Sequence, residues 1–257
     1  MAWSKFPHSD DAYTYTAASL KKHWARLHVG DAEAFPANAQ LVEAWIAFHA
    51  GEFEKAAKLG LAEGVEGYSV ANKAACIYAT YLEKSEKKKI AIFEEVAARA
   101  EEQQHAQPKN ANAFYWHAYA LGRYAQGISV VKALAQGVGG KVRASLDATL
   151  KLAPKHADAH IALGAYHAEI IDKVGAMVGG LTYGAKKDEG MKHFKTALEL
   201  NPESAIARIE YANALVMLDG KKKMEEAVAL YEAAAACEPR DAMECLDVQL
   251  AQEELEE

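Results

Sequence analysis

The chain has 257 residues, of which 51% are hydrophobic, and a formal net charge of −7 at pH 7. With 17 glycines and 6 prolines, this composition excludes a disordered or collagen-like chain and suits one large domain. The acidic balance argues against a protein that holds nucleic acid through its net charge. Three cysteines without metal-ligand spacing are typical of a reducing compartment.

The sequence contains neither a secretory signal nor a spanning segment. The first residues, MAWSKFPHSDDAY, lack a basic stretch followed by an apolar one, and no apolar run approaches the ~20 residues that cross a bilayer. We therefore expect a cytoplasmic protein without direct membrane insertion.

The first expected helix is capped by Ser9 and Asp10 and ends at Gly30. Steps of four and three residues place its apolar side chains on one face. They are Tyr13, Ala17, Leu20, Trp24 and Leu27.

Hairpins of two helices follow. Asn38 caps a helix over residues 39–50, which turns at Gly51 into a second helix over 52–64. The stretches 70–83 and 88–104 form the next pair by their periodicity. Long alternations of Val, Ile and Thr, which would indicate strands, are absent.

A spaced motif recurs at the end of the later hairpins: a small residue, then an aromatic, an alanine and a proline. Its clearest copies are Gly190, Phe194, Ala197 and Pro202, and Ala227, Tyr231, Ala234 and Pro239. A weaker copy is Val142, Leu146, Thr149 and Pro154. This ending is typical of a tetratricopeptide (TPR) helix pair, in which small residues let two helices approach and proline stops the second.

Two of these hairpins are longer than a TPR unit because of apolar inserts at 128–140 and 170–187. Each insert carries a Gly-Gly pair, Gly139-Gly140 and Gly179-Gly180. The first pair resembles a phosphate loop only superficially, and we expect a loop-to-helix turn with positive φ there. The inserts either cover the helices or form an interface.

These patterns predict an all-α fold, a TPR-like right-handed α-solenoid of antiparallel helix pairs with two lengthened hairpins. We expect a single domain over residues 1–257. It comprises an N-terminal helix and linker (1–36), helix pairs (37–239), and a capping helix with an acidic tail (240–257).

The region from Ile90 to Leu218 resembles the TPR-like domain of the regulator of microtubule dynamics proteins. The shared pattern is two helix pairs with lengthened turns followed by HFKTALELNP, residues 193–202. The region is also similar to the T-component family of bacterial TRAP transporters, in which an Ala-Leu-Gly-x-Tyr helix, here residues 120–124 and 162–166, precedes a Gly-Gly turn. Members of the first family are often membrane-tethered and those of the second are exported.

Aromatic side chains are concentrated between Phe114 and Tyr124, more densely than one helix seam needs. With nearby arginine they match the composition of binding hot spots, and burial under the insert is the alternative. The candidate groove residues are Tyr115, Trp116, Tyr119, Arg123, Tyr166, His160, His167 and Asn213.

No catalytic or metal site is expected. His156, His160 and His167 have a spacing that suits one helix face, but no Glu follows His156 as in a His-Glu-x-x-His zinc motif, and packing explains His167. No nucleophile motif is present.

We therefore expect a non-enzymatic scaffold that binds a protein or peptide partner in a concave groove, without a cofactor and without nucleic acid. The alternative is a carrier of a small molecule or lipid, with a pocket closed by the apolar inserts. The oligomeric state stays open.

Overall fold

The structure, a computed structural model, describes residues 3–8 and 13–256. Within this part of the chain helices form and strands do not, which confirms the all-α class. The helices are α1 (Ala17–Leu27), α2 (Ala39–His49), α3 (Phe53–Ala62), η2 (Gly64–Gly67), α4 (Tyr68–Tyr81), α5 (Glu86–Ala106), α6 (Ala111–Ile128), α7 (Val130–Ala135), α8 (Val138–Leu152), α9 (Ala157–Val174), α10 (Ala176–Tyr183), α11 (Lys187–Leu200), α12 (Ala205–Asp219), η3 (Gly220–Lys223), α13 (Met224–Ala235) and α14 (Ala242–Glu256).

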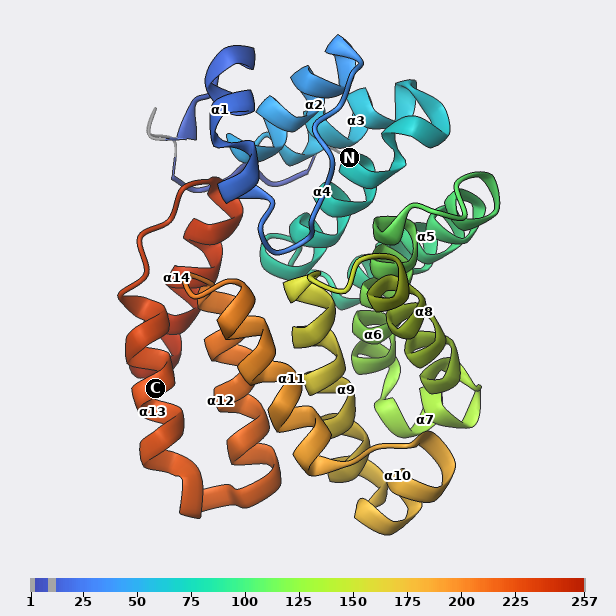
Figure 1. The fold of residues 1–257 in the computed structure, drawn as a ribbon, viewed down its shortest axis with the longest axis vertical. Helices are drawn as coiled ribbons and strands as arrows, with labels where there is room; N and C mark the ends of the chain where they lie inside the picture. The colour runs from blue at the N-terminus through green and yellow to red at the C-terminus, as the bar shows by residue number, and fades with distance from the viewer. Residues whose placement is uncertain (1–2, 9–12, 257) are drawn as a thin grey trace.

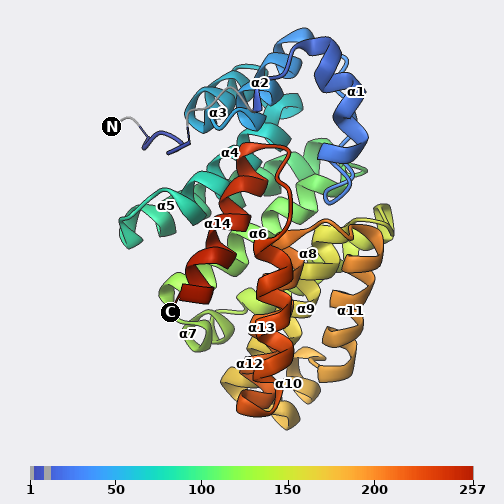
Figure 2. The ribbon, with the colours of Figure 1, turned by 90° about the vertical axis from the view of Figure 1, so that its left-hand side faces the viewer.

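Helices that follow one another in the chain pack against one another (Figure 1). Thus α3 contacts α2 and α4, α5 contacts α4 and α6, and α6 contacts α8. Further along, α9 contacts α11 and α12, and α13 contacts α12 and α14. The last helix departs from this order, because α14 also contacts α2 and reaches the end of α4 (Figure 2).

The start of α2 agrees with its expected cap. The side chain of Asn38 accepts a hydrogen bond from the N–H of Gln40 at 2.8 Å, as expected for the cap of α2. The first helix starts later than expected, at Ala17, where Thr16 is the cap. Tyr13 therefore precedes α1, and Ser9 and Asp10 lie outside the described residues.

The recurring motif coincides with close packing between two helices. Phe194 and Ala197 of α11 are fully buried. The ring of Phe194 lies so close to α9 that a Cβ on Gly164 would come within 2.6 Å of it. A glycine in α9 therefore allows α11 to approach, as the motif predicts.

Both inserts form short helices, α7 and α10. The expected positive φ at Gly139-Gly140 is wrong, because these residues lie in the first turn of α8 and the left-handed residue is Gly137, with φ 77°. Gly139 is needed for space instead, since a Cβ there would come within 2.6 Å of Leu134.

The inserts present part of their apolar surface outward. Met177 and Leu181 of α10 are 76% and 85% exposed, and Val131 of α7 is 54% exposed. In contrast, Leu134 and Gly179 face the core. The inserts therefore cover the helices with one side only.

Candidate functional site

A cavity of about 180 Å³ lies between α4, α6, α7, α8, α9, α12 and α14. One face of α6 lines it, with Tyr115, Tyr119 and Arg123 at steps of four residues. One face of α9 lines it from Asp158 to Ile170. The cavity therefore runs along two neighbouring helices.

Five of the expected groove residues line this cavity: Tyr115, Trp116, Tyr119, Arg123 and Tyr166. Three of them are mostly buried, with 5% of Tyr115, 2% of Trp116 and 8% of Tyr166 exposed. Tyr119 and Arg123 are only partly buried. They offer the most accessible of these five side chains to a ligand.

The other three expected residues do not line the cavity. The Nδ1 atom of His160 lies 2.8 Å from that of His193, and His167 accepts a hydrogen bond from the N–H of Lys186 at 3.1 Å. Burial lowers the pKa of His167 to about 4, so this ring is a neutral packing element near pH 7. Asn213 accepts a hydrogen bond from Tyr231 on the exposed side of α12.

The Arg123 end of the cavity is already neutralised. Arg123 donates to Glu210 at 3.1 Å and lies 5.3 Å from the ring centre of Tyr119, whose hydroxyl is 2.9 Å from that of Thr80. These contacts hold the guanidinium in place with a carboxylate and an aromatic face.

Another part of the cavity, here called the acidic end, is lined by Asp158, Glu244 and Asp247. Arg26 donates to Glu244 at 2.6 Å, and Tyr81 donates to Asp247. The carboxylate of Asp158 has no hydrogen bond or ion pair with a described residue. Burial and the charge of Asp31 raise the pKa of Asp158 to about 7.

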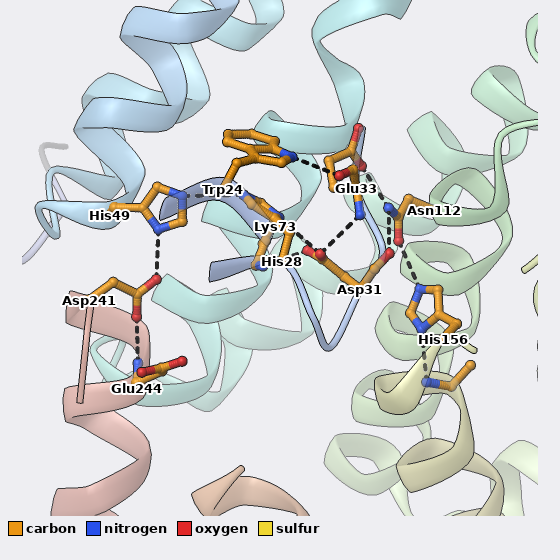
Figure 3. A network of polar contacts seen from close by, with 11 residues as sticks. Trp24, His28, Asp31, Glu33, His49, Lys73, Asn112, His156, Asp241 and Glu244 are labelled. Atoms are coloured by element: carbon orange, nitrogen blue, oxygen red, sulfur yellow. Dashed lines mark hydrogen bonds and ion pairs between the residues drawn. The ribbon is translucent and has the colours of Figure 1, made fainter. Parts of the chain in front are cut away.

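A network of buried polar groups borders this end (Figure 3). The ammonium of Lys73 donates to Asp31 at 2.6 Å, and both side chains are no more than 2% exposed. Burial alone would raise the pKa of Asp31, but Lys73 and His28 hold it well below its usual range. The pair is therefore ionised and buried, which is costly unless both partners are present.

The network continues to the C-terminal helix. His28 lies 2.9 Å from Asp31, and His49 lies 2.7 Å from Asp241, each through Nδ1. The Nε2 atoms of the two rings are 3.3 Å apart. Asp241 also accepts from the N–H of Glu244 at 2.8 Å and so caps α14.

A second arm reaches α9 through Asn112. Its amide nitrogen donates to Glu33 at 2.6 Å, and its oxygen lies 2.9 Å from Nε2 of His156. His156 Nδ1 accepts from the N–H of Ala159 at 3.1 Å, so His156 is the cap of α9. Its neutral form, with the proton on Nε2, satisfies both contacts.

These positions account for His156 without a metal ion. Among the described residues, no group of three or more His, Cys, Asp or Glu side chains is arranged to hold a metal. In the same part of the chain, no helix is long and apolar enough to cross a membrane.

Sequence reasoning missed the ion network and the acidic end. One signal in the sequence could have indicated the role of Lys73, because it is a charged residue in the otherwise uncharged helix α4. Its partner Asp31 lies in the loop after α1, where nothing in the sequence marks it as buried.

An all-helical fold with a cavity on a helix-lined face is an architecture that binding proteins use. The model of one family, Regulator of microtubule dynamics protein 1-3, matches residues 64–257. The chain therefore belongs to the regulator of microtubule dynamics family. No curated protein matches the chain. The similarity to the T-component family stays a prediction.

Proposed function

We propose that this chain is a non-enzymatic, cytoplasmic adaptor of the microtubule system that binds a peptide or protein along the cavity-bearing face. Membership of the regulator of microtubule dynamics family supports a microtubule-related interaction role. The observation that carries the choice of site is the partly buried pair Tyr119 and Arg123 on the cavity wall. Aromatic and arginine side chains of this kind dominate binding energies at protein interfaces.

The proposed architecture is a single TPR-like, right-handed α-solenoid. Its support is the packing of successive helices and the glycine that lets α11 approach α9. In such arrays the concave face is the usual binding surface.

The carrier alternative has less support. Pockets that enclose a drug-sized ligand measure about 300–1,000 Å³. The cavity measures about 180 Å³, which is enough for a side chain or a benzene-sized molecule. Its size therefore favours a groove that receives part of a larger partner.

Co-sedimentation with polymerised tubulin tests the proposal. Two polymers are compared, one of purified tubulin and one that retains its associated proteins. Pelleting with the first makes tubulin the partner, and pelleting only with the second makes an associated protein the partner. Pelleting with neither contradicts the proposal.

The double variant Tyr119→Ala/Arg123→Ala tests the site. We expect its binding to weaken at least about tenfold, since each truncated hot spot costs about 2 kcal/mol or more. The matched control is Arg143→Ala, which removes an arginine that pairs with exposed Asp147 at 2.9 Å outside the cavity. Equal binding by the double variant and the control would place the partner elsewhere.

A further inference from the structure

The cavity has an excess of acidic groups. Its ionisable lining comprises two cations, Lys73 and Arg123, and six carboxylates. The carboxylates are Asp31, Asp158, Glu169, Glu210, Glu244 and Asp247. A small enclosed space with this balance attracts positive charge.

The cations near the acidic end are already committed to other carboxylates. Lys73 contacts Asp31 at 2.6 Å, and Arg26, which lies outside the cavity lining, contacts Glu244 at 2.6 Å. Neither contacts Asp158 or Asp247. Two carboxyl groups at this end therefore make no ion pair with either cation, although Lys73 attracts Asp158 without contacting it.

The two groups differ in their surroundings but share this deficit. Asp247 is 5% exposed and accepts a hydrogen bond from the neutral hydroxyl of Tyr81. Asp158 has no hydrogen bond or ion pair with a described residue, and its carboxylate lies against Gly30, where a Cβ would meet it at 2.4 Å. Asp158 is half-buried on the cavity wall, and a carboxylate there without a donor or a cation in contact is an arrangement that a ligand can improve.

The charges around Asp158 come from several elements. Asp31 in the loop after α1 and Glu244 on α14 act against its ionisation, and Lys73 on α4 favours it. Burial raises the pKa of Asp247 well above its usual range, and the charges of Asp241, Glu244 and Asp158 act in the same direction. Burial and neighbouring carboxylates thus raise the pKa of both groups at the acidic end.

The walls of this end are apolar and aromatic. Leu27, Ile77, Tyr81 and Tyr115 line it together with the acids. Such walls suit a short alkyl chain, and aromatic faces attract a cationic head.

We infer that the acidic end of the cavity binds an organic cation, a primary ammonium or guanidinium on a short alkyl chain, with Asp158 and Asp247 as its counter-ions. The cation is supplied by a lysine or arginine side chain of a partner or by a free amine. The cavity would bind a free amine whether or not the groove binds a protein of the microtubule system. Failure of either proposal therefore leaves the other standing.

Calorimetric titration with n-butylamine, the lysine side chain without its backbone, tests this site. We expect a dissociation constant on the order of 1 mM for so small a ligand. Its neutral and anionic counterparts, n-butanol and butyrate, should bind at least about tenfold more weakly, because they lack the charge. Equal binding of n-butanol and n-butylamine, or no binding of the amine, would overturn the inference.

Variants locate the site. Asp158→Asn and Asp247→Asn should each weaken n-butylamine binding by about tenfold. Asp188→Asn, which removes one exposed carboxylate at the start of α11, is the control with the same net charge. Unchanged binding in both cavity variants would refute the assignment.

A measurement on the unmodified chain covers the case in which a variant does not fold. Because the cation favours ionised Asp158, binding near pH 7 should release protons, and affinity should increase from pH 6 to pH 8. Titration in two buffers of different ionisation enthalpy detects the release, and its absence would contradict the role of Asp158.

N-acetyl-lysine amide then separates the two sources of the cation. If it binds as n-butylamine does, the cation is a partner's side chain, and if only the free amine binds, the cation is a small molecule.

Discussion

Removal of the buried ammonium of Lys73 provides the sharpest test of the ion network. In Lys73→Met the alkyl chain is replaced by one of similar size, but Asp31 loses its partner at 2.6 Å. The carboxylate keeps only His28 at 2.9 Å and the N–H of Glu33 at 3.2 Å. The ammonium also lies 5.1 Å from the ring centre of Phe48, and this attraction is lost as well.

The expected cost follows from this geometry. Breaking a buried ion pair by removing one partner costs about 3–5 kcal/mol, because an uncompensated charge remains. Since His28 stays beside Asp31, we expect a value near the lower limit, about 3 kcal/mol. In a chain of this size such a loss lowers the melting temperature by about 6–12 °C.

Urea unfolding at pH 7, followed by circular dichroism, measures the change in the free energy of unfolding. The control is Lys58→Met, because Lys58 makes an exposed pair with Glu54 at 2.6 Å and such pairs contribute less than about 1 kcal/mol. The double variant Lys73→Met/Asp31→Asn should recover much of the loss, since neither charge remains. A loss below about 1 kcal/mol in Lys73→Met, or a double variant less stable than the single one, would refute the reasoning.

Three further predictions concern a close helix contact and two titrating groups. Gly164→Ala should destabilise the chain by about 1–3 kcal/mol, because Phe194 is fully buried and cannot move aside, whereas Gly122→Ala, with open space at its Cβ, should stabilise it by up to about 1 kcal/mol. Thermal unfolding of both variants decides this, and equal effects would contradict it. Asp158→Asn should be as stable as the unmodified chain near pH 4 and more stable by about 1–2 kcal/mol at pH 8. The reason is that the folded pKa of Asp158, about 7, lies above the unfolded value, so the stability of the unmodified chain falls as the pH rises towards 7. For His156 the folded pKa of about 4 lies below the unfolded value, so the unfolded chain binds the proton first. The stability of the unmodified chain should therefore fall from pH 6.5 to pH 4. His156→Asn, which keeps a capping side chain, should show a shallower fall in urea titrations over that range.

The helices were predictable because their signals are local. The capping residue Asn38 and the turn at Gly51 can each be recognised from a few adjacent residues. The structure has both, with φ 82° at Gly51. The short helices α7 and α10 were missed because their few residues are apolar without a clear period.

The two Ala-Leu-Gly-x-Tyr segments also have different surroundings, although their sequences are equivalent. Gly122 and Gly164 occupy the same place in the two Ala-Leu-Gly-x-Tyr segments, yet only Gly164 faces a neighbouring ring. The difference lies in what packs against each helix, which the motif does not encode.

For the candidate site, the face of α6 was readable from its spacing, while the acidic end was not. Tyr115, Tyr119 and Arg123 follow one another at steps of four residues within one helix. Asp158 and Asp247 come from α9 and α14, and each alone reads as an ordinary acid in the first turns of a helix. Only the packing of α14 across the cavity brings them together.

The ion network gives the Lys73 experiment its wider significance. In an array in which helices contact only their neighbours, a change in α4 is felt in α3 and α5. Here Asp31 and Lys73 connect through His28 and His49 to Asp241, the cap of α14, which is 192 residues from His49 in the sequence. The loss of Lys73 should therefore loosen the helix that closes the acidic end of the cavity, and the same variant should bind n-butylamine more weakly although Lys73 itself carries a positive charge. Tighter binding would mean that Lys73 acts only by repelling the cation and that the network does not hold α14.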